Sequence, residues 1–131
     1  LAGSSAASDV YKRQINDVAQ INNKDSISSC AKKMTDNPLG AALLLENGSL
    51  KGIVTEGDLR KSIASNLDLS NSIEPFINDN PISIHSSVSI LDAMKIMEDR
   101  SSKISCLPVI DSDGKCLGLL TIHDLYQTKL V

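Results

Sequence analysis

The chain has 131 residues, a formal net charge of −3, a pI near 5.2 and 41% hydrophobic residues. This length corresponds to one ordinary domain or to two small units that share a core. The acidic balance provides no basic patch for nucleic acid, three aromatic residues provide no platform for stacked bases, and no run of about 18 apolar residues is present that would cross a membrane.

The cysteines indicate a reducing environment. The chain has three cysteines, Cys30, Cys106 and Cys116, and no Cys-x-x-Cys spacing. Because this number is odd and the spacing is absent, neither a disulfide framework nor a zinc site is expected. Each cysteine lies in an apolar context, where it is predicted to be a small buried hydrophobe. We therefore expect a cytoplasmic protein.

Residues 1–14 (LAGSSAASDVYKRQ) are predicted to be a disordered or non-native leader. They are small and polar and then charged, without the basic and apolar form of a signal peptide. Their last residues, SDVYKRQ, resemble translated adapter sequence. We exclude this segment from the predicted fold.

The first repeat is predicted over residues 15–66 and reads as strand, helix, strand, strand, helix. Ser26 precedes apolar residues spaced at i, i+3, i+4 and i+7, which is typical of a capped amphipathic helix. Asn47-Gly48 separates two apolar runs and is a strong hairpin signal. The expected elements are a weak strand at 15–21, a helix from 27 that ends at Asn37-Pro38, strands at 41–45 and 50–55, and a helix at 56–65.

Residues 67–71 are a mostly polar connector, and the second repeat is predicted over residues 72–131. A short helical turn at 72–77 leads into it. Ser89 followed by Asp92 is close to a capping box, and Asp113-Gly114 is interpreted as a turn equivalent to Asn47-Gly48. The expected elements are strands at 81–84, 107–110 and 116–121, with helices from residue 90 and at 122–129.

A short phrase occurs once in each repeat. Gly52-Ile53-Val54-Thr55-Glu56-Gly57-Asp58-Leu59 returns 66 residues later as Gly118-Leu119-Leu120-Thr121-Ile122-His123-Asp124-Leu125. A long-period repeat indicates one supersecondary unit used twice. We predict an α+β (α/β-like) fold of two βαββα repeats packed sheet to sheet with pseudo-twofold symmetry, and the cleft between them is the expected ligand site.

The repeated motif Gly-h-h-Thr-x-x-Asp, in which h is apolar, lies at a strand-to-helix junction. A glycine lets another group approach the backbone closely, and the threonine hydroxyl with the first helical N–H groups can hold a phosphate. The aspartate carboxylate can accept both hydroxyls of a ribose. The candidate ligand-binding residues are Gly52, Thr55, Asp58, Gly118, Thr121, His123 and Asp124.

Another interpretation explains the same motif without a ligand. Thr-x-x-Asp is also a helix-capping pattern, which stabilises a helix by about 1 kcal/mol. Because both copies start a helix, repetition does not decide between capping and binding, and the two roles are compatible. His123 is either a phosphate contact or an exposed residue at the start of a helix. The two histidines of the chain, His85 and His123, have no third ligand at a metal-like spacing, so no metal site is predicted.

Two βαββα units, each closing with Gly-h-h-Thr-x-x-Asp-Leu, resemble a pair of CBS domains. This resemblance covers residues 15–131 and implies an adenine nucleotide or related ligand in the clefts. It places Thr55 and Thr121 near phosphate and Asp58 and Asp124 on ribose.

The segments TEGDLRK (55–61) and His123-Asp124-Leu125 are similar to the C-terminal CBS pair of arabinose-5-phosphate isomerases. That resemblance implies an upstream sugar-isomerase domain as partner, and no part of this chain matches its active site. We therefore expect no enzyme activity in this chain and no required cofactor.

Two functions follow as expectations. The first is a regulatory module that senses an adenine nucleotide or sugar nucleotide and modulates an attached sugar-phosphate isomerase, as part of a homo-oligomer. The alternative is a ligand-free scaffold that dimerises through exposed helix faces, either in the same enzyme or as a stand-alone CBS protein. A free-standing enzyme has no support, because no nucleophile–base pair or metal cluster is present.

Overall fold

The structure is a computed structural model that describes residues 12–98 and 104–129. The chain divides into two compact units. The N-terminal unit comprises Asp17–Pro81, and the C-terminal unit comprises Ile82–Val131 together with the start of the chain up to Asn16. Both units mix helices with a sheet, as predicted.

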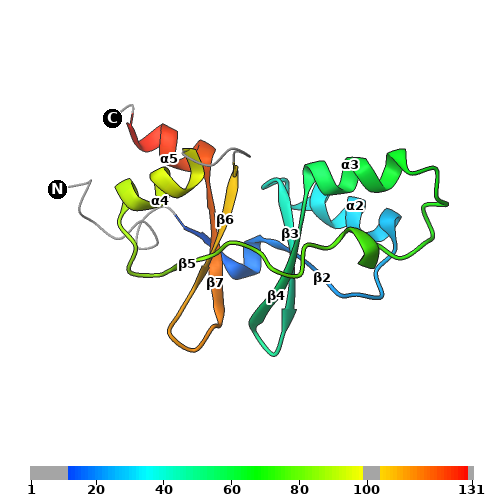
Figure 1. Cartoon of the computed structure of the whole chain (residues 1–131), viewed down its shortest axis with the longest axis horizontal. Helices are drawn as coiled ribbons and strands as arrows, with labels where there is room; N and C mark the ends of the chain where they lie inside the picture. Colours follow the sequence, from blue (N-terminus) through cyan, green and yellow to red (C-terminus); the bar gives the residue numbers. More distant parts are fainter. Residues whose placement is uncertain (1–11, 99–103, 130–131) are drawn as a thin grey trace. The chain divides into compact units, whose positions relative to one another are not determined.

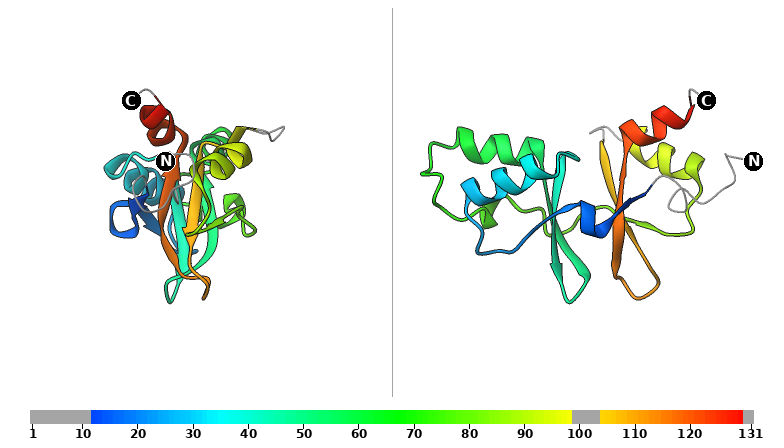
Figure 2. Two further views of the ribbon diagram at one scale, coloured as in Figure 1. Left: turned by 90° about the vertical axis from the view of Figure 1, so that its left-hand side faces the viewer. Right: turned by 180° about the vertical axis from the view of Figure 1, so that it is seen from behind.

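The N-terminal unit contains a three-stranded sheet in the order β2-β3-β4, with β2 parallel and β4 antiparallel to β3. Figures 1 and 2 show α2 and α3 on the same side of this sheet. Its elements are β2 (Ala19–Ile21), α2 (Ile27–Asp36), β3 (Ala41–Glu46), β4 (Ser49–Thr55), α3 (Glu56–Ala64) and the 3₁₀ turn η3 (Glu74–Phe76).

Local sequence signals set the bounds of these elements. The Ser26 side chain accepts a hydrogen bond from Ser29 N and begins α2, whose residues Ile27, Cys30 and Met34 are buried. The hairpin between β3 and β4 turns at Asn47 and Gly48, with φ angles of 52° and 82°. Two consecutive positive φ angles are typical of a type I′ turn, so this predicted hairpin is confirmed.

The C-terminal unit contains a four-stranded sheet in the order β1-β7-β6-β5. Its elements are β1 (Arg13–Gln14), β5 (Ile84–His85), α4 (Ile90–Glu98), β6 (Cys106–Ile110), β7 (Cys116–Thr121) and α5 (Ile122–Lys129), and the 3₁₀ turn η2 (Ile15–Asp17) joins the two units. The last strand and the last helix have the predicted bounds.

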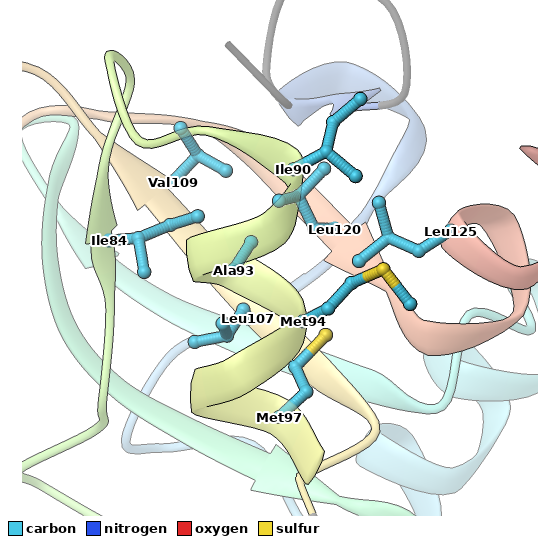
Figure 3. Packing of buried hydrophobic residues seen from close by; sticks show 9 residues of the cluster. All are labelled: Ile84, Ile90, Ala93, Met94, Met97, Leu107, Val109, Leu120 and Leu125. Atoms are coloured by element: carbon cyan, nitrogen blue, oxygen red, sulfur yellow. The ribbon is translucent and has the colours of Figure 1, made fainter. Parts of the chain in front are cut away.

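The core of the C-terminal unit lies between α4 and the sheet. Figure 3 shows Met94 beside Leu120 and Leu125, with Met97 one turn further along α4. The predicted apolar face of this helix is confirmed, because its members are all buried: Ile90, Ala93, Met94 and Met97. Burial of each large apolar side chain contributes roughly 1.5–3 kcal/mol to folding.

The segments that open the two repeats, Arg13–Gln14 and residues 72–81, each contact the motif strand of the other repeat. Arg13 pairs with Leu119 of β7. Ile53, which lies 66 residues before Leu119 at the equivalent position of the first repeat, forms a bridge with Asn78. Arg13–Gln14, which are the last two residues of the predicted leader, are ordered in β1. Residues 72–81, assigned to the second repeat, belong to the N-terminal unit, where Ile73 is fully buried.

Two local predictions differ from the structure. The strand predicted at 81–84 is reduced to β5, because Pro81 and Pro108 lack the N–H donors that a longer ladder with β6 requires. The turn at Asp113-Gly114 has a positive φ at Gly114 alone. The Asp111 carboxylate accepts hydrogen bonds from Asp113 N and Lys115 N, which makes this turn wider than the one at Asn47-Gly48.

The cysteines are free and buried, as predicted: Cys30, Cys106 and Cys116. Burial raises the pKa of the Cys30 thiol to about 11, which keeps it protonated and inert at neutral pH. Within residues 12–98 and 104–129, no helix has the length and apolar character needed to cross a membrane.

Candidate functional site

The motif of the N-terminal unit lies where β4 ends and α3 begins. Thr55 is the last residue of β4 and the N-cap of α3, with an extended backbone at φ −90° and ψ 170°. Asp58 follows at the third position of the helix, and both side chains are partly buried. The extended strand therefore delivers the threonine, and the first helical turn folds the aspartate back toward it.

Thr55 and Asp58 form a complete capping box. Thr55 N and Thr55 Oγ1 both donate to Asp58 Oδ2 at 3.0 Å, and Asp58 N donates to Thr55 Oγ1 at 3.3 Å. The capping interpretation is thus confirmed for this copy. The threonine hydroxyl proton is engaged, whereas Asp58 Oδ1 has no hydrogen-bond donor among the described residues.

The first N–H groups of α3 are mostly engaged as well. Glu56 N donates to Gly40 O at 3.1 Å, and Asp58 N is held by Thr55. Among these three amides, Gly57 N alone has no acceptor within the described part of the chain. The helix start therefore has fewer donors for a phosphate than the sequence predicts, and the exposed Glu56 adds a negative charge there.

The motif of the C-terminal unit has the same cap but a different partner. Asp124 N donates to Thr121 Oγ1 at 3.1 Å, and Ile122 N donates to Ser105 O at 2.8 Å. The Arg13 guanidinium binds both carboxylate oxygens of Asp124, with Nε to Oδ2 at 2.9 Å and Nη2 to Oδ1 at 2.8 Å. Its hydrogen bonds are the main cause that holds the pKa of Asp124 below its ordinary value.

Arg13 was not predicted as a site residue, because residues 1–14 were excluded from the predicted fold. A two-residue strand leaves no periodic signal, and its partner Asp124 lies 111 residues away. Glu56 was also missed as a site residue. The signal that finds it is the comparison of the two motifs, in which Glu56-Gly57 of the first aligns with Ile122-His123 of the second.

The two motif glycines admit the chain's own backbone. A Cβ on Gly118 would lie 1.9 Å from Arg13 O, and one on Gly52 would lie 2.6 Å from Ile77 Cγ2 and 3.1 Å from Asn78 O. The predicted close approach is confirmed, but the approaching groups are the exchanged segments. Both glycines are buried, so they position the motif rather than contact solvent.

The two histidines lie in different surroundings, His123 in the repeated motif and His85 in β5. His123 is exposed on α5, and its charge contributes to the lowered pKa of Asp124. His85 has Nδ1 at 2.9 Å from Ser87 Oγ and Nε2 at 3.2 Å from Ser112 Oγ. No group of three or more metal-ligating side chains is found within the residues that the structure places.

A separate cavity of about 580 Å³ lies in the C-terminal unit. It is lined by Met97, Glu98, Ile104, Ser105, Ile122 and Tyr126. Ile122 and Tyr126 are one helical turn apart on α5, whereas Asp124 lies halfway between them and projects from the other side of the helix. This cavity therefore does not include the motif carboxylate.

A family model described as the CBS domain matches residues 7–65 and 73–129. The arabinose 5-phosphate isomerase KdsD of Pseudomonas aeruginosa is 34% identical over 108 residues, which are 81% of this chain and 32% of that protein. The corresponding isomerase of Francisella tularensis is 31% identical over 119 residues, with 90% of this chain and 36% of that protein covered. The chain thus spans about a third of the length of these relatives.

Solved structures share the fold. CBSX2 in complex with AMP, a protein of Arabidopsis thaliana, has a TM-score of 0.79 and 19% identity, with 96% of each chain covered. PAE2072 of Pyrobaculum aerophilum complexed with AMP has a TM-score of 0.76 and 24% identity, with 91% of this chain and 88% of that chain covered. At these identities the likeness concerns the fold.

Proposed function

The chain belongs to the CBS-domain family, and on that premise we propose that it is a regulatory module that binds an adenine nucleotide or a sugar nucleotide through its repeated motifs. The observation that carries this proposal is the duplicated junction at which a threonine, a carboxylate and a helix start come together. The AMP found in the CBSX2 and PAE2072 structures supports adenine nucleotides as the ligand class.

In this proposal, different motif residues bind different parts of the nucleotide. Asp58 and Asp124 accept the ribose hydroxyls, as a carboxylate with an available oxygen does well. In the C-terminal unit, His123 and the start of α5 lie near a phosphate, where the helix dipole favours negative charge. Because Arg13 holds both oxygens of Asp124, a ribose at this motif requires that guanidinium to move away.

The partner of the module is an attached sugar-phosphate isomerase domain, as in the arabinose 5-phosphate isomerases that this chain resembles. A ligand shifts such a domain only when its affinity differs between the two arrangements of the parent protein. This chain supplies the sensing and not the catalysis. Turnover of arabinose 5-phosphate by the 131-residue chain alone would contradict that division.

A thermal-shift panel tests the sensing function. AMP, ADP, ATP, S-adenosylmethionine and CMP-Kdo are each added to the chain and to the variants Asp58→Ala and Asp124→Ala. A ligand at about 100 times its dissociation constant adds roughly 2.7 kcal/mol to the free energy of unfolding. We expect a shift with at least one nucleotide that weakens in one or both variants, and no shift with any of them would refute the proposal.

Exposed apolar side chains on the helices favour the alternative function of a scaffold. Ile63 on α3 is 48% exposed, Leu91 on α4 is 56% exposed and Tyr126 on α5 is 44% exposed. Single exposed apolar side chains are common on protein surfaces, and a contiguous patch of them marks a surface that binds a second protein copy. If light scattering shows a dimer that Leu91→Asp dissociates, and no nucleotide shifts the melting temperature, the scaffold function is favoured.

A further inference from the structure

We propose that Glu56 makes the motif of the N-terminal unit select against phosphate, so that this motif takes a nucleoside and the motif of the C-terminal unit takes the phosphate-bearing ligand. This inference rests on the proposed function and names the ligand class of each copy. It follows from a comparison of two motifs that share one backbone arrangement within a single chain.

The first motif carries more negative charge than the second. The helix start of α3 carries the carboxylates of Glu56 and Asp58, and the cation of Arg60 follows one turn later on an exposed side chain. The ion pairs found among the described residues, Arg13–Asp124 and Lys33–Asp25, do not neutralise Glu56. A phosphate near α3 therefore meets two negative charges.

The motif of the C-terminal unit has an apolar residue where the first motif has Glu56. Ile122 occupies the first position of α5, and the exposed His123 occupies the second, where the first motif has Gly57. Arg13 pairs with the one carboxylate of this motif, and when a ribose displaces that guanidinium the motif carries one carboxylate against the two of the first motif. The first helix position thus carries a negative charge in one copy and no charge in the other.

The hydrogen bonds at the two helix starts are alike, because Ile122 N and Asp124 N are engaged in the second motif as Glu56 N and Asp58 N are in the first. Thr55 Oγ1 donates its proton to Asp58 Oδ2, and Glu56 N already donates to Gly40 O. Among the described residues, a phosphate at either helix start has one remaining amide donor, Gly57 N in α3 or His123 N in α5, so the difference between the copies lies in their charge. The ribose of a nucleoside, by contrast, needs an acceptor, which Asp58 Oδ1 provides.

The test is a titration of the 131-residue chain with AMP and with adenosine, followed by the amide NMR shifts of Gly57 and His123 at low salt. We expect AMP to shift the His123 amide at lower concentration than the Gly57 amide. Adenosine, which has no phosphate, is expected to shift the two amides without a preference for His123. In Glu56→Gln, which keeps the side-chain size and removes the charge, the AMP affinity at Gly57 is expected to rise about five- to tenfold while that of adenosine stays unchanged.

Glu46→Gln is the matched control, since Glu46 is an exposed carboxylate at the end of β3 and its loss changes the net charge equally. The gain in Glu56→Gln should disappear at about 1 M salt, where charges are screened within roughly 3 Å. Equal AMP affinity at Gly57 in the wild type and in Glu56→Gln would overturn this inference and leave the proposed function standing. The absence of any shift with both ligands would refute both.

Discussion

Asp58 and Asp124 occupy the same position of the repeat, yet the first is bound by its own helix cap and the second by a guanidinium from the start of the chain. One carboxylate keeps an oxygen available, and the other has both oxygens engaged by Arg13. Identical motif residues therefore differ in what a ligand must displace.

Replacing Asp58 tests its structural role apart from its ligand role. Asp58→Ala removes the acceptor of two hydrogen bonds from Thr55 and is expected to lower the free energy of unfolding by about 1 kcal/mol in urea denaturation. Asp58→Asn keeps an acceptor oxygen and should retain most of the stability. Equal destabilisation by both variants would mean that the charge, and not the hydrogen bonds, stabilises the helix start.

Replacing Arg13 changes the acid dependence of stability. Arg13 lowers the pKa of Asp124, so the pair stabilises the folded state above the ordinary value of 3.8, and this contribution is lost as the pH falls through the lowered pKa. Arg13→Ala should therefore reduce the unfolding free energy at pH 7 by roughly 0.2–1 kcal/mol, since Arg13 is half exposed, and the difference should vanish in strong acid.

The matched control is Arg60→Ala, which removes an exposed arginine of α3. It should leave the pH dependence unchanged. An NMR titration of the Asp124 carboxyl is expected to show a higher pKa in Arg13→Ala. An unchanged carboxyl pKa would show that Arg13 does not contact Asp124 in solution.

Adding a methyl group to Gly118 displaces the exchanged strand. The new Cβ would lie 1.9 Å from Arg13 O, which is backbone and cannot turn aside, so Gly118→Ala is expected to release β1 and expose the amides of β7 to hydrogen exchange. Gly57→Ala is the control, because its Cβ would meet no atom closer than 3.7 Å. Alanine also favours a helix over glycine by up to about 1 kcal/mol, so this variant should be at least as stable as the wild type.

Truncating Leu107 tests the core of the C-terminal unit. Leu107 is fully buried in β6, and Leu107→Ala is expected to cost about 2–5 kcal/mol in urea denaturation through lost burial and a residual cavity. Leu91→Ala is the control, since that leucine is mostly exposed, and should change stability by less than about 0.5 kcal/mol. Comparable losses in both variants would mean that Leu91 is covered in solution.

Sequence patterns predicted the parts of this fold that depend on neighbouring residues. The cap at Ser26, the hairpin at Asn47-Gly48 and the helix at 122–129 are all local, and the structure confirms them. The exchange of the opening segments was not predicted, because the pairing of Arg13 with Leu119 joins residues far apart in the sequence. Propensity and periodicity carry no information about such a contact.

The candidate site was likewise predicted only where it depends on local sequence. The motif positions follow from the repeat, and the capping box at Thr55 and Asp58 agrees with one of the two interpretations offered for them. The sequence did not indicate which donors were already engaged, since the acceptor of Glu56 N is the carbonyl of Gly40 in a different loop. The role of each motif residue toward a ligand stays a prediction.

Because each opening segment contacts the motif strand of the other repeat, a single repeat expressed alone lacks one of these contacts. A gene that encoded a single copy would produce a sheet whose edge beside the motif glycine is bare, and a second molecule would have to fill it. Tandem fusion tethers donor and acceptor permanently in one polypeptide. A mutation in either opening segment is then expected to affect the half of the duplication whose motif strand that segment contacts.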